Sequence, residues 1–169
     1  IKPEELALFD VPKFMERFRY HLRKCGSEGA SGFLLARLHG EHEPNENLLW
    51  PHMHVVATGG MIDVLERAKR YYKRYDVECG PRTKVLLKAE ADRLAQLSYV
   101  FQSFWPCRYR GPAADDPKRT IRQRQKQRIP EPIHSAWLLK MDSSEPADLL
   151  LVIGSPKLSN RLRKLYKTV

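Results

Sequence analysis

The sequence of 169 residues is long enough for one α/β domain, and its hydrophobic fraction of 42% can form a real core. It contains no apolar run of about 18 residues, so we expect no membrane-spanning helix. The net charge of +10 and the isoelectric point of about 9.7 favour a polyanionic partner, and we expect nucleic acid, not a membrane.

The start of the chain and its cysteines indicate the compartment. The first ten residues lack the basic and apolar segments of a secretory signal peptide. Because the chain does not begin with methionine, we expect it to be part of a longer protein. Cys25, Cys79 and Cys107 are far apart and form no CxxC pair, so neither a disulfide framework nor a zinc knuckle is expected. A reducing, cytoplasmic setting fits this pattern.

Hydrophobic periodicity in the first half of the chain predicts regular elements. Phe14, Phe18 and Leu22 recur every four residues, as on one face of an amphipathic helix. Alternation and turn residues mark two strands that follow. The predicted segments are helix 12–24, strand 31–41, turn 42–48, strand 49–58 and helix 61–75.

The second half of the chain is less regular. Its predicted segments are strand 83–89, helix 90–104, a loop or basic arm over 106–132, strand 133–141, a segment 145–153 that fits either a helix or a buried strand, and a short basic helix over 156–167. We therefore expect a core of residues 1–105, a basic arm of residues 106–132, and a C-terminal part, residues 133–169, that completes the same domain.

The order of these elements predicts an α+β fold. Adjacent strands joined by a short turn must pair antiparallel. The central sheet, of about four or five strands, is therefore expected to be mostly antiparallel, with helices packed against it.

Two histidines on the second predicted strand form a candidate metal site. His52 and His54 are separated by one residue, so their side chains share a face of the strand, about 7 Å apart along it. Two imidazoles at this spacing can converge on one ion. The competing interpretation is a pair of half-exposed strand histidines with no ligand.

A third ligand is expected from the neighbouring strand. With a turn near 44–47, facing residues have numbers that add up to about 91, which places His39 opposite His52. A slip of two residues places Glu41 there and keeps it on the same face. Glu43 is a further alternative, and the sequence leaves the three open.

The sequence of residues 50–56, WPHMHVV, resembles the His-hydrophobic-His motif of the HUH endonucleases, which include rolling-circle replication initiators, relaxases and some transposases. The resemblance covers about residues 30–105. It implies an HUH- or RRM-like sheet and a divalent ion, Mg²⁺ or Mn²⁺, held by the histidines and a third ligand. It also implies a tyrosine that attacks the scissile phosphate, leaving a 5′-phosphotyrosine and a free 3′-hydroxyl.

The resemblance also indicates the nucleophile. In the family, a helix and a strand follow the histidines, and the next helix carries the tyrosine. Tyr99, on the predicted helix 90–104, matches that place. Tyr71, Tyr72 and Tyr75 follow the histidines with no intervening strand, so they rank second.

One departure from the family concerns the residue three positions after the tyrosine. Replication initiators commonly have lysine there, and this chain has Gln102. Gln102 shares a helix face with Tyr99 and could hydrogen-bond a phosphate, but it brings no charge. Lys88 or Arg93 could supply it. No second tyrosine lies one turn from Tyr99, which favours a single-tyrosine mechanism.

Basic residues indicate where DNA would bind. The stretch 118–128 contains six Lys or Arg and no acid, and could follow a DNA backbone, although a solvated charged loop competes with this interpretation. Trp105, Arg108 and Tyr109 could stack on unpaired bases, and Trp105 fits the core equally well. The candidate nucleic-acid-binding residues are Lys88, Gln102, Arg108, Lys118, Arg119, Arg122 and Arg124.

Together, these features predict an enzyme that nicks and religates single-stranded or hairpin DNA, as in rolling-circle replication or mobile-element transfer. A helicase, separate or fused, could be a further partner. Two alternatives stay open: an HUH-derived module that binds DNA without cleaving it, which Gln102 favours, and a metal-dependent hydrolase that uses an activated water.

Overall fold

The computed structural model describes residues 1–72, 100–101, 105–112, 120–122, 125–145, 147–155 and 160–161. The predicted strand 83–89 and most of the predicted helices 90–104 and 156–167 lie outside these residues. The described elements, in chain order, are η1 (Pro3–Leu8), α1 (Val11–Lys24), β1 (Leu34–Glu43), β2 (Leu48–Ala57), α2 (Met61–Ala68), η2 (Lys69–Tyr71), β3 (Pro106–Cys107), β4 (Arg110–Pro112), β5 (Thr120–Arg122), β6 (Gln127–Arg128), α4 (Ile133–Asp142) and β7 (Leu150–Ile153).

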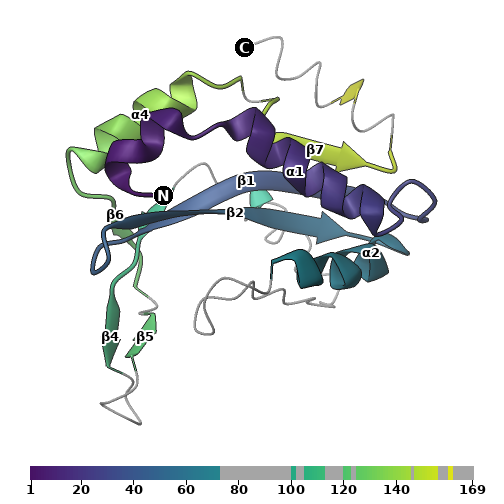
Figure 1. Ribbon diagram of the computed structural model, residues 1–169, viewed down its shortest axis with the longest axis horizontal. Helices are drawn as coiled ribbons and strands as arrows, with labels where there is room; N and C mark the ends of the chain where they lie inside the picture. Colours follow the sequence, from purple (N-terminus) through teal and green to yellow (C-terminus); the bar gives the residue numbers. More distant parts are fainter. Residues whose placement is uncertain are drawn as a thin grey trace. The chain divides into compact units, whose positions relative to one another are not determined.

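The predicted α+β class is confirmed (Figure 1). Within the described residues, five strands form one sheet in the order β2-β1-β3-β6, and β7 also pairs with β1. β1 pairs antiparallel with β7 but parallel with β3, where His42 faces Cys107. The sheet is therefore mixed, not purely antiparallel. A parallel neighbour arises because the partner strand comes from far along the chain and not from a hairpin.

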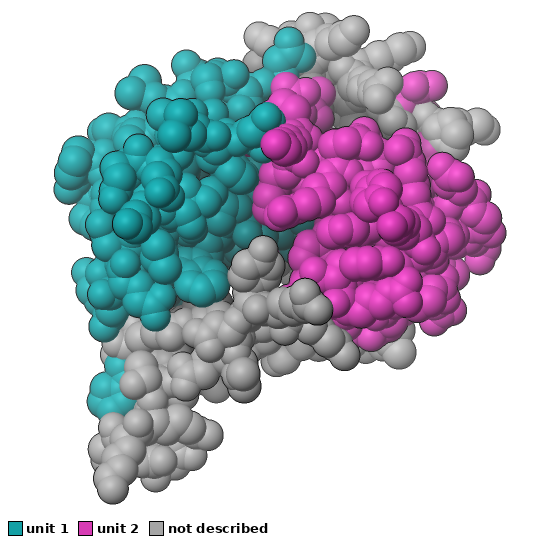
Figure 2. Space-filling view, in the orientation of Figure 1, with its two compact units in different colours: residues 1–10, 38–53, 102–145 teal, residues 11–37, 54–101, 146–169 magenta. Residues whose placement is uncertain are grey.

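The chain forms two compact units, coloured separately in Figure 2. Unit 1 contains residues 1–10, 38–53 and 102–145, and unit 2 contains residues 11–37, 54–101 and 146–169. The boundaries fall inside β1 and β2, so each of these long strands contributes one part to each unit.

Unit 1 packs η1 against α4 (Figure 1). Lys140 on α4 donates from Nζ to the carbonyl oxygen of Ala7 at 3.2 Å. The chain start is fixed to β2, because the Ile1 amino group donates to the Leu49 carbonyl at 3.0 Å and the Leu49 amide returns a bond to Ile1 at 2.8 Å. The buried apolar side chains of this unit include Leu6, Leu49, Trp105, Ile129 and Trp137.

Unit 2 packs α1 against α2 (Figure 1). The predicted stripe of α1 is confirmed in part, since Phe18 and Leu22 are buried. Arg67 on α2 donates from Nε and Nη2 to the carbonyl oxygen of Cys25, at 3.2 and 2.7 Å, and so satisfies a free carbonyl just beyond the end of α1. The predicted helix over 61–75 ends earlier as an α-helix and continues as η2.

The prediction of a strand over 133–141 is wrong, because this segment is the helix α4. Its sequence is apolar with little alternation, and a short apolar run does not distinguish a buried strand from a helix. The local signals favour a helix. Pro132 directly precedes it, and the Glu131 carboxylate accepts hydrogen bonds from the amide and the hydroxyl of Ser135. Trp137 is its buried residue.

The stretch 106–132, predicted as a loop or arm, contains the four short strands β3, β4, β5 and β6. Each is only two or three residues long, too short for hydrophobic periodicity to reveal. β3 is a strand because it pairs with β1, far away in the sequence. The ambiguous segment 145–153 contains the strand β7.

None of the helices within the described residues has the length and hydropathy needed to cross a membrane.

Candidate metal centre

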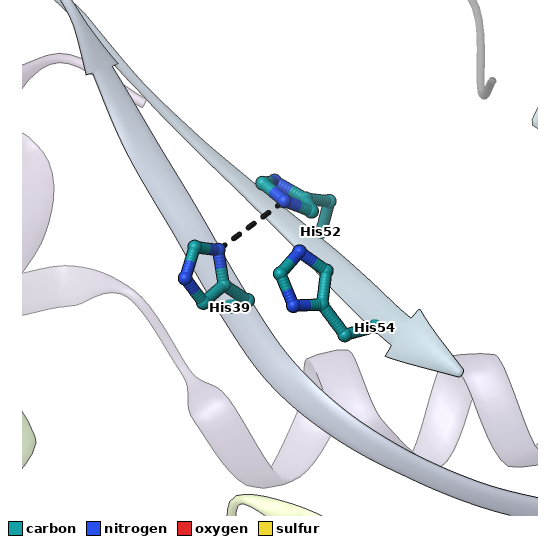
Figure 3. Close-up of side chains that lie close together, drawn as sticks. All are labelled: His39, His52 and His54. Atoms are coloured by element: carbon teal, nitrogen blue, oxygen red, sulfur yellow. Dashed lines mark hydrogen bonds between the residues drawn. The ribbon is translucent and has the colours of Figure 1, made fainter. Parts of the chain in front are cut away.

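Three histidines on two neighbouring strands converge (Figure 3). His39 lies on β1, and His52 and His54 lie on β2. One ring nitrogen of each lies within 4.8 Å of those of the other two, and His39 Nδ1 is 3.3 Å from His52 Nε2. Two nitrogens that bind one tetrahedral ion at about 2.05 Å are themselves about 3.3 Å apart. The three histidines, named below the histidine cluster, could therefore hold a metal ion.

His52 is oriented as metal-binding histidines usually are. Its Nδ1 lies 2.9 Å from the carbonyl oxygen of Trp50, so the ring donates its proton there and leaves the lone pair on Nε2, facing His39. Burial lowers the pKa of His52, the Trp50 carbonyl opposes this shift, and the charge of Arg108 adds to it. The lowered pKa favours the neutral imidazole, which is the form that binds a metal.

His39 is buried and lies near a tryptophan ring. It is only 3% exposed, and its ring centroid lies 6.2 Å from that of Trp105, which is equally buried. Gly40 permits this packing, because a Cβ atom there would come within 2.3 Å of the Trp105 ring. Trp105 in turn contacts Trp137, with centroids 5.4 Å apart. Trp105 is therefore a core residue and not an exposed base-stacking platform.

The two carboxylates considered as third ligand have other contacts. Glu41 is buried and is not a member of the histidine cluster; its Oε2 lies 3.7 Å from Nε of Arg108. Glu43 accepts hydrogen bonds from the backbone amides of Asn45 and Glu46, at 3.1 and 2.9 Å, and so orders the β1–β2 turn. Of the alternatives that the sequence left open, the structure brings His39 to the other two histidines.

Two of the tyrosines that ranked second, Tyr71 and Tyr72, have structural partners in unit 2. The Tyr72 hydroxyl lies 2.9 Å from Nδ1 of His21, and burial raises the pKa of Tyr72 to about 12. Tyr71 stacks on His21, with centroids 4.4 Å apart, and the Arg70 guanidinium lies 5.0 Å from the Tyr71 ring centre.

The other predicted site residues fall in three groups. Arg108 and Tyr109 are described, and Tyr109 is exposed. Arg122 lies on β5, where the backbone alone is described. The remaining predicted residues lie outside the described part of the chain: Tyr75, Lys88, Arg93, Tyr99, Gln102, Lys118, Arg119 and Arg124.

The structure adds two residues that the sequence reasoning missed. Trp50 orients His52 through its carbonyl oxygen, and Gly40 admits the indole that packs against His39. A backbone carbonyl leaves no trace in a sequence. Gly40 does, since a glycine inside a strand often marks a close approach of another group.

Searches of protein-family models, curated proteins and solved structures found no match to this chain. The resemblance to the HUH endonucleases therefore rests on the residues quoted above alone.

Proposed function

We propose that this chain is a metal-dependent nuclease of the HUH type, which nicks and religates single-stranded DNA through Tyr99. The convergence of His39, His52 and His54 from two neighbouring strands carries this proposal. A His-Met-His string is a weak signal alone. It gains weight because the neighbouring strand supplies a third imidazole, and because the chain has the net charge of +10 that suits a polyanionic substrate.

The donor set bears on the choice of metal. Three neutral imidazoles suit borderline ions better than Mg²⁺, which prefers oxygen ligands and keeps much of its water. We therefore favour Mn²⁺ over Mg²⁺, and expect Zn²⁺ to bind well in vitro. When bound, the ion would act as a Lewis acid that stabilises negative charge on the scissile phosphate.

The covalent step is assigned to Tyr99. Its phenolic oxygen, after losing the proton, forms a bond to phosphorus, and the bond between phosphorus and the 3′-oxygen breaks. The 3′-oxygen takes up a proton and leaves as a hydroxyl, and the 5′ end stays on the tyrosine. The new bond preserves the phosphodiester energy, so attack by a 3′-hydroxyl reverses the step and religates the strand.

A contact close to Tyr99 in the sequence supports this assignment. Val100 is buried, and the carbonyl oxygen of Phe101 accepts a hydrogen bond from Nη1 of Arg37 at 2.5 Å. Arg37 lies on β1, two residues before His39. The segment that follows Tyr99 is thus anchored to the strand that carries one of the three histidines.

A covalent adduct is the test of this function. Labelled single-stranded DNA is incubated with the full chain and Mn²⁺, and the products are separated on a denaturing gel. We expect a protein–DNA adduct that is absent in Tyr99→Phe and retained in the matched variant Tyr72→Phe. Cleavage that survives in Tyr99→Phe would rule out the tyrosine mechanism.

One observation favours a second candidate, a hydrolase that uses a metal-activated water. Three histidines with a free fourth position are the donor set of some catalytic zinc sites. This candidate predicts cleavage in Tyr99→Phe and no adduct in the parent chain. Binding of DNA without any cleavage would instead indicate a non-cleaving module, for which Gln102 is the sequence argument.

A further inference from the structure

Two basic residues lie across from one another at the end of the β3–β6 pair in unit 1. The register of this pair sets Pro106 opposite Arg128 and Cys107 opposite Gln127. The same register, continued by one residue, sets Arg108 opposite Lys126. Like charges in directly opposed positions are unfavourable unless another charge compensates for them. For Arg108, the Glu41 carboxylate supplies such a charge.

Arg108 is fixed beside the sheet by two contacts with β1. Its backbone amide donates to the carbonyl oxygen of His42 at 2.9 Å, and its Nε lies 3.7 Å from Oε2 of Glu41. The Arg108 side chain is only 20% exposed. Within the described residues its buried Nε has no hydrogen-bond partner. A guanidinium carries five N–H donors, so Arg108 can bind a further anionic acceptor beside Glu41.

This arginine is close to the histidine cluster. Glu41 follows His39 by two residues on β1, so the two side chains share a face of the strand. The parallel β1–β3 register sets His42 opposite Cys107, so Arg108, one residue on, lies level with Glu43 and diagonal to Glu41, whose carboxylate its Nε approaches. The charge of Arg108 contributes, after burial, to the lowered pKa of Lys126, which agrees with the closeness of the two cations.

We propose that Arg108 and Lys126 form a phosphate-binding subsite beside the histidine cluster, which holds the backbone of single-stranded DNA next to the cleaved bond. The inference rests on the proposed function for its ligand. Arg108 can present two parallel N–H groups to a phosphate, and Lys126 adds an exposed ammonium group.

The test is DNA binding in the absence of metal, so that no cleavage can occur. Fluorescence anisotropy of a labelled oligothymidylate is measured in EDTA over a series of salt concentrations. We expect Arg108→Gln and Lys126→Gln each to weaken binding, by about tenfold for Arg108, and each to reduce the salt-dependence slope by about 0.7. Glu41→Gln should tighten binding, because it removes the negative charge that competes with the phosphate.

Arg23→Gln is the matched control, since it removes the same charge from an exposed arginine that pairs with Glu16 and Glu28. It should retain the parental affinity and slope. Arg108→Gln leaves Glu41 buried without its cation, so circular dichroism must first show that this variant is folded. If it is not, Lys126→Gln decides alone, because that side chain is exposed.

Parental affinity and slope in folded Arg108→Gln and in Lys126→Gln would overturn the subsite. This outcome is separable from a failure of the proposed function. A chain that binds DNA through these residues but forms no adduct retains the subsite and loses the nuclease mechanism. If both variants form the adduct as well as the parent does, the nuclease mechanism is retained and the subsite is rejected.

Discussion

Histidine side chains contact other aromatic rings in both units of this molecule, but the surroundings of His52 suit a metal ligand and those of His21 do not. In unit 1, the lone pair on His52 Nε2 faces His39 at 3.3 Å, and the opposite ring nitrogen is used by a backbone carbonyl. In unit 2, the Nδ1 of His21 faces the Tyr72 hydroxyl at 2.9 Å, and Tyr71 covers a face of the ring. An imidazole can act as a metal ligand where its lone pair and those of other ligand atoms converge on one position.

The same difference bears on the tyrosines. Tyr72 uses its hydroxyl to join α1 to the end of α2 and η2, and its pKa of about 12 makes the phenolate costly to form. A nucleophile needs the reverse, an accessible hydroxyl that ionises readily. Tyr72 therefore fits a packing role, which supports ranking it behind Tyr99.

The largest expected difference between the histidine cluster and the His21 site in unit 2 is the effect of a metal ion on stability. A ligand that binds the folded chain alone stabilises it by about 2.7 kcal/mol at a concentration of 100 times its dissociation constant. We expect Mn²⁺ to raise the free energy of unfolding of the parent chain and of His21→Ala by the same increment. The increment should vanish in His54→Ala. Urea denaturation with and without Mn²⁺ measures it, and equal increments in all three chains would contradict the assignment.

A second prediction concerns the packing around His39. Gly40→Ala places a Cβ atom 2.3 Å from the Trp105 ring, and we expect this overpacking to destabilise the chain by about 1–3 kcal/mol. A Cβ atom at Gly29 would meet nothing within 4 Å, so Gly29→Ala should stay within about 0.5 kcal/mol of the parent. Urea denaturation of the two variants gives the comparison. Equal stabilities would mean that Trp105 does not pack on β1 as described.

The smallest effect is expected at Tyr72. Tyr72→Phe removes one hydrogen bond and should cost about 1 kcal/mol at neutral pH. Because the pKa of Tyr72 is raised from 10 to about 12, the unfolded chain loses this proton first, so the parent loses stability as the pH rises from 10 towards 12. Tyr72→Phe lacks this contribution, and its stability relative to the parent should improve over that range. A constant difference between the two chains would refute the buried hydroxyl.

The sequence was informative where neighbouring residues determine structure. Alternation along β1 and β2 and the short turn between them predicted the hairpin, and the shared face of His52 and His54 followed from it. The third ligand stayed open, because a slip of two residues keeps every side chain on its face. In the structure, His39 Nδ1 lies 3.3 Å from His52 Nε2, whereas the Glu41 carboxylate lies 3.7 Å from Arg108, a residue far along the chain.

Local sequence patterns are uninformative where structure depends on distant partners. β3 has two residues and exists through its pairing with β1 at His42. The apolar segment of α4 has no clear period, and its packing against η1 buries Trp137. Neither feature has a local signal strong enough to decide between a strand, a helix and a loop.

A direct titration of the metal site tests the central claim. Mn²⁺ binding is measured by isothermal titration calorimetry on the parent chain, on His39→Ala and on Glu41→Gln, with circular dichroism to show that each is folded. We predict a single site in the parent, an affinity at least about 100-fold lower in His39→Ala, since even residues that only orient ligands cost 10- to 100-fold, and no change in Glu41→Gln. An unchanged affinity in His39→Ala, or a loss confined to Glu41→Gln, would contradict the three-histidine site.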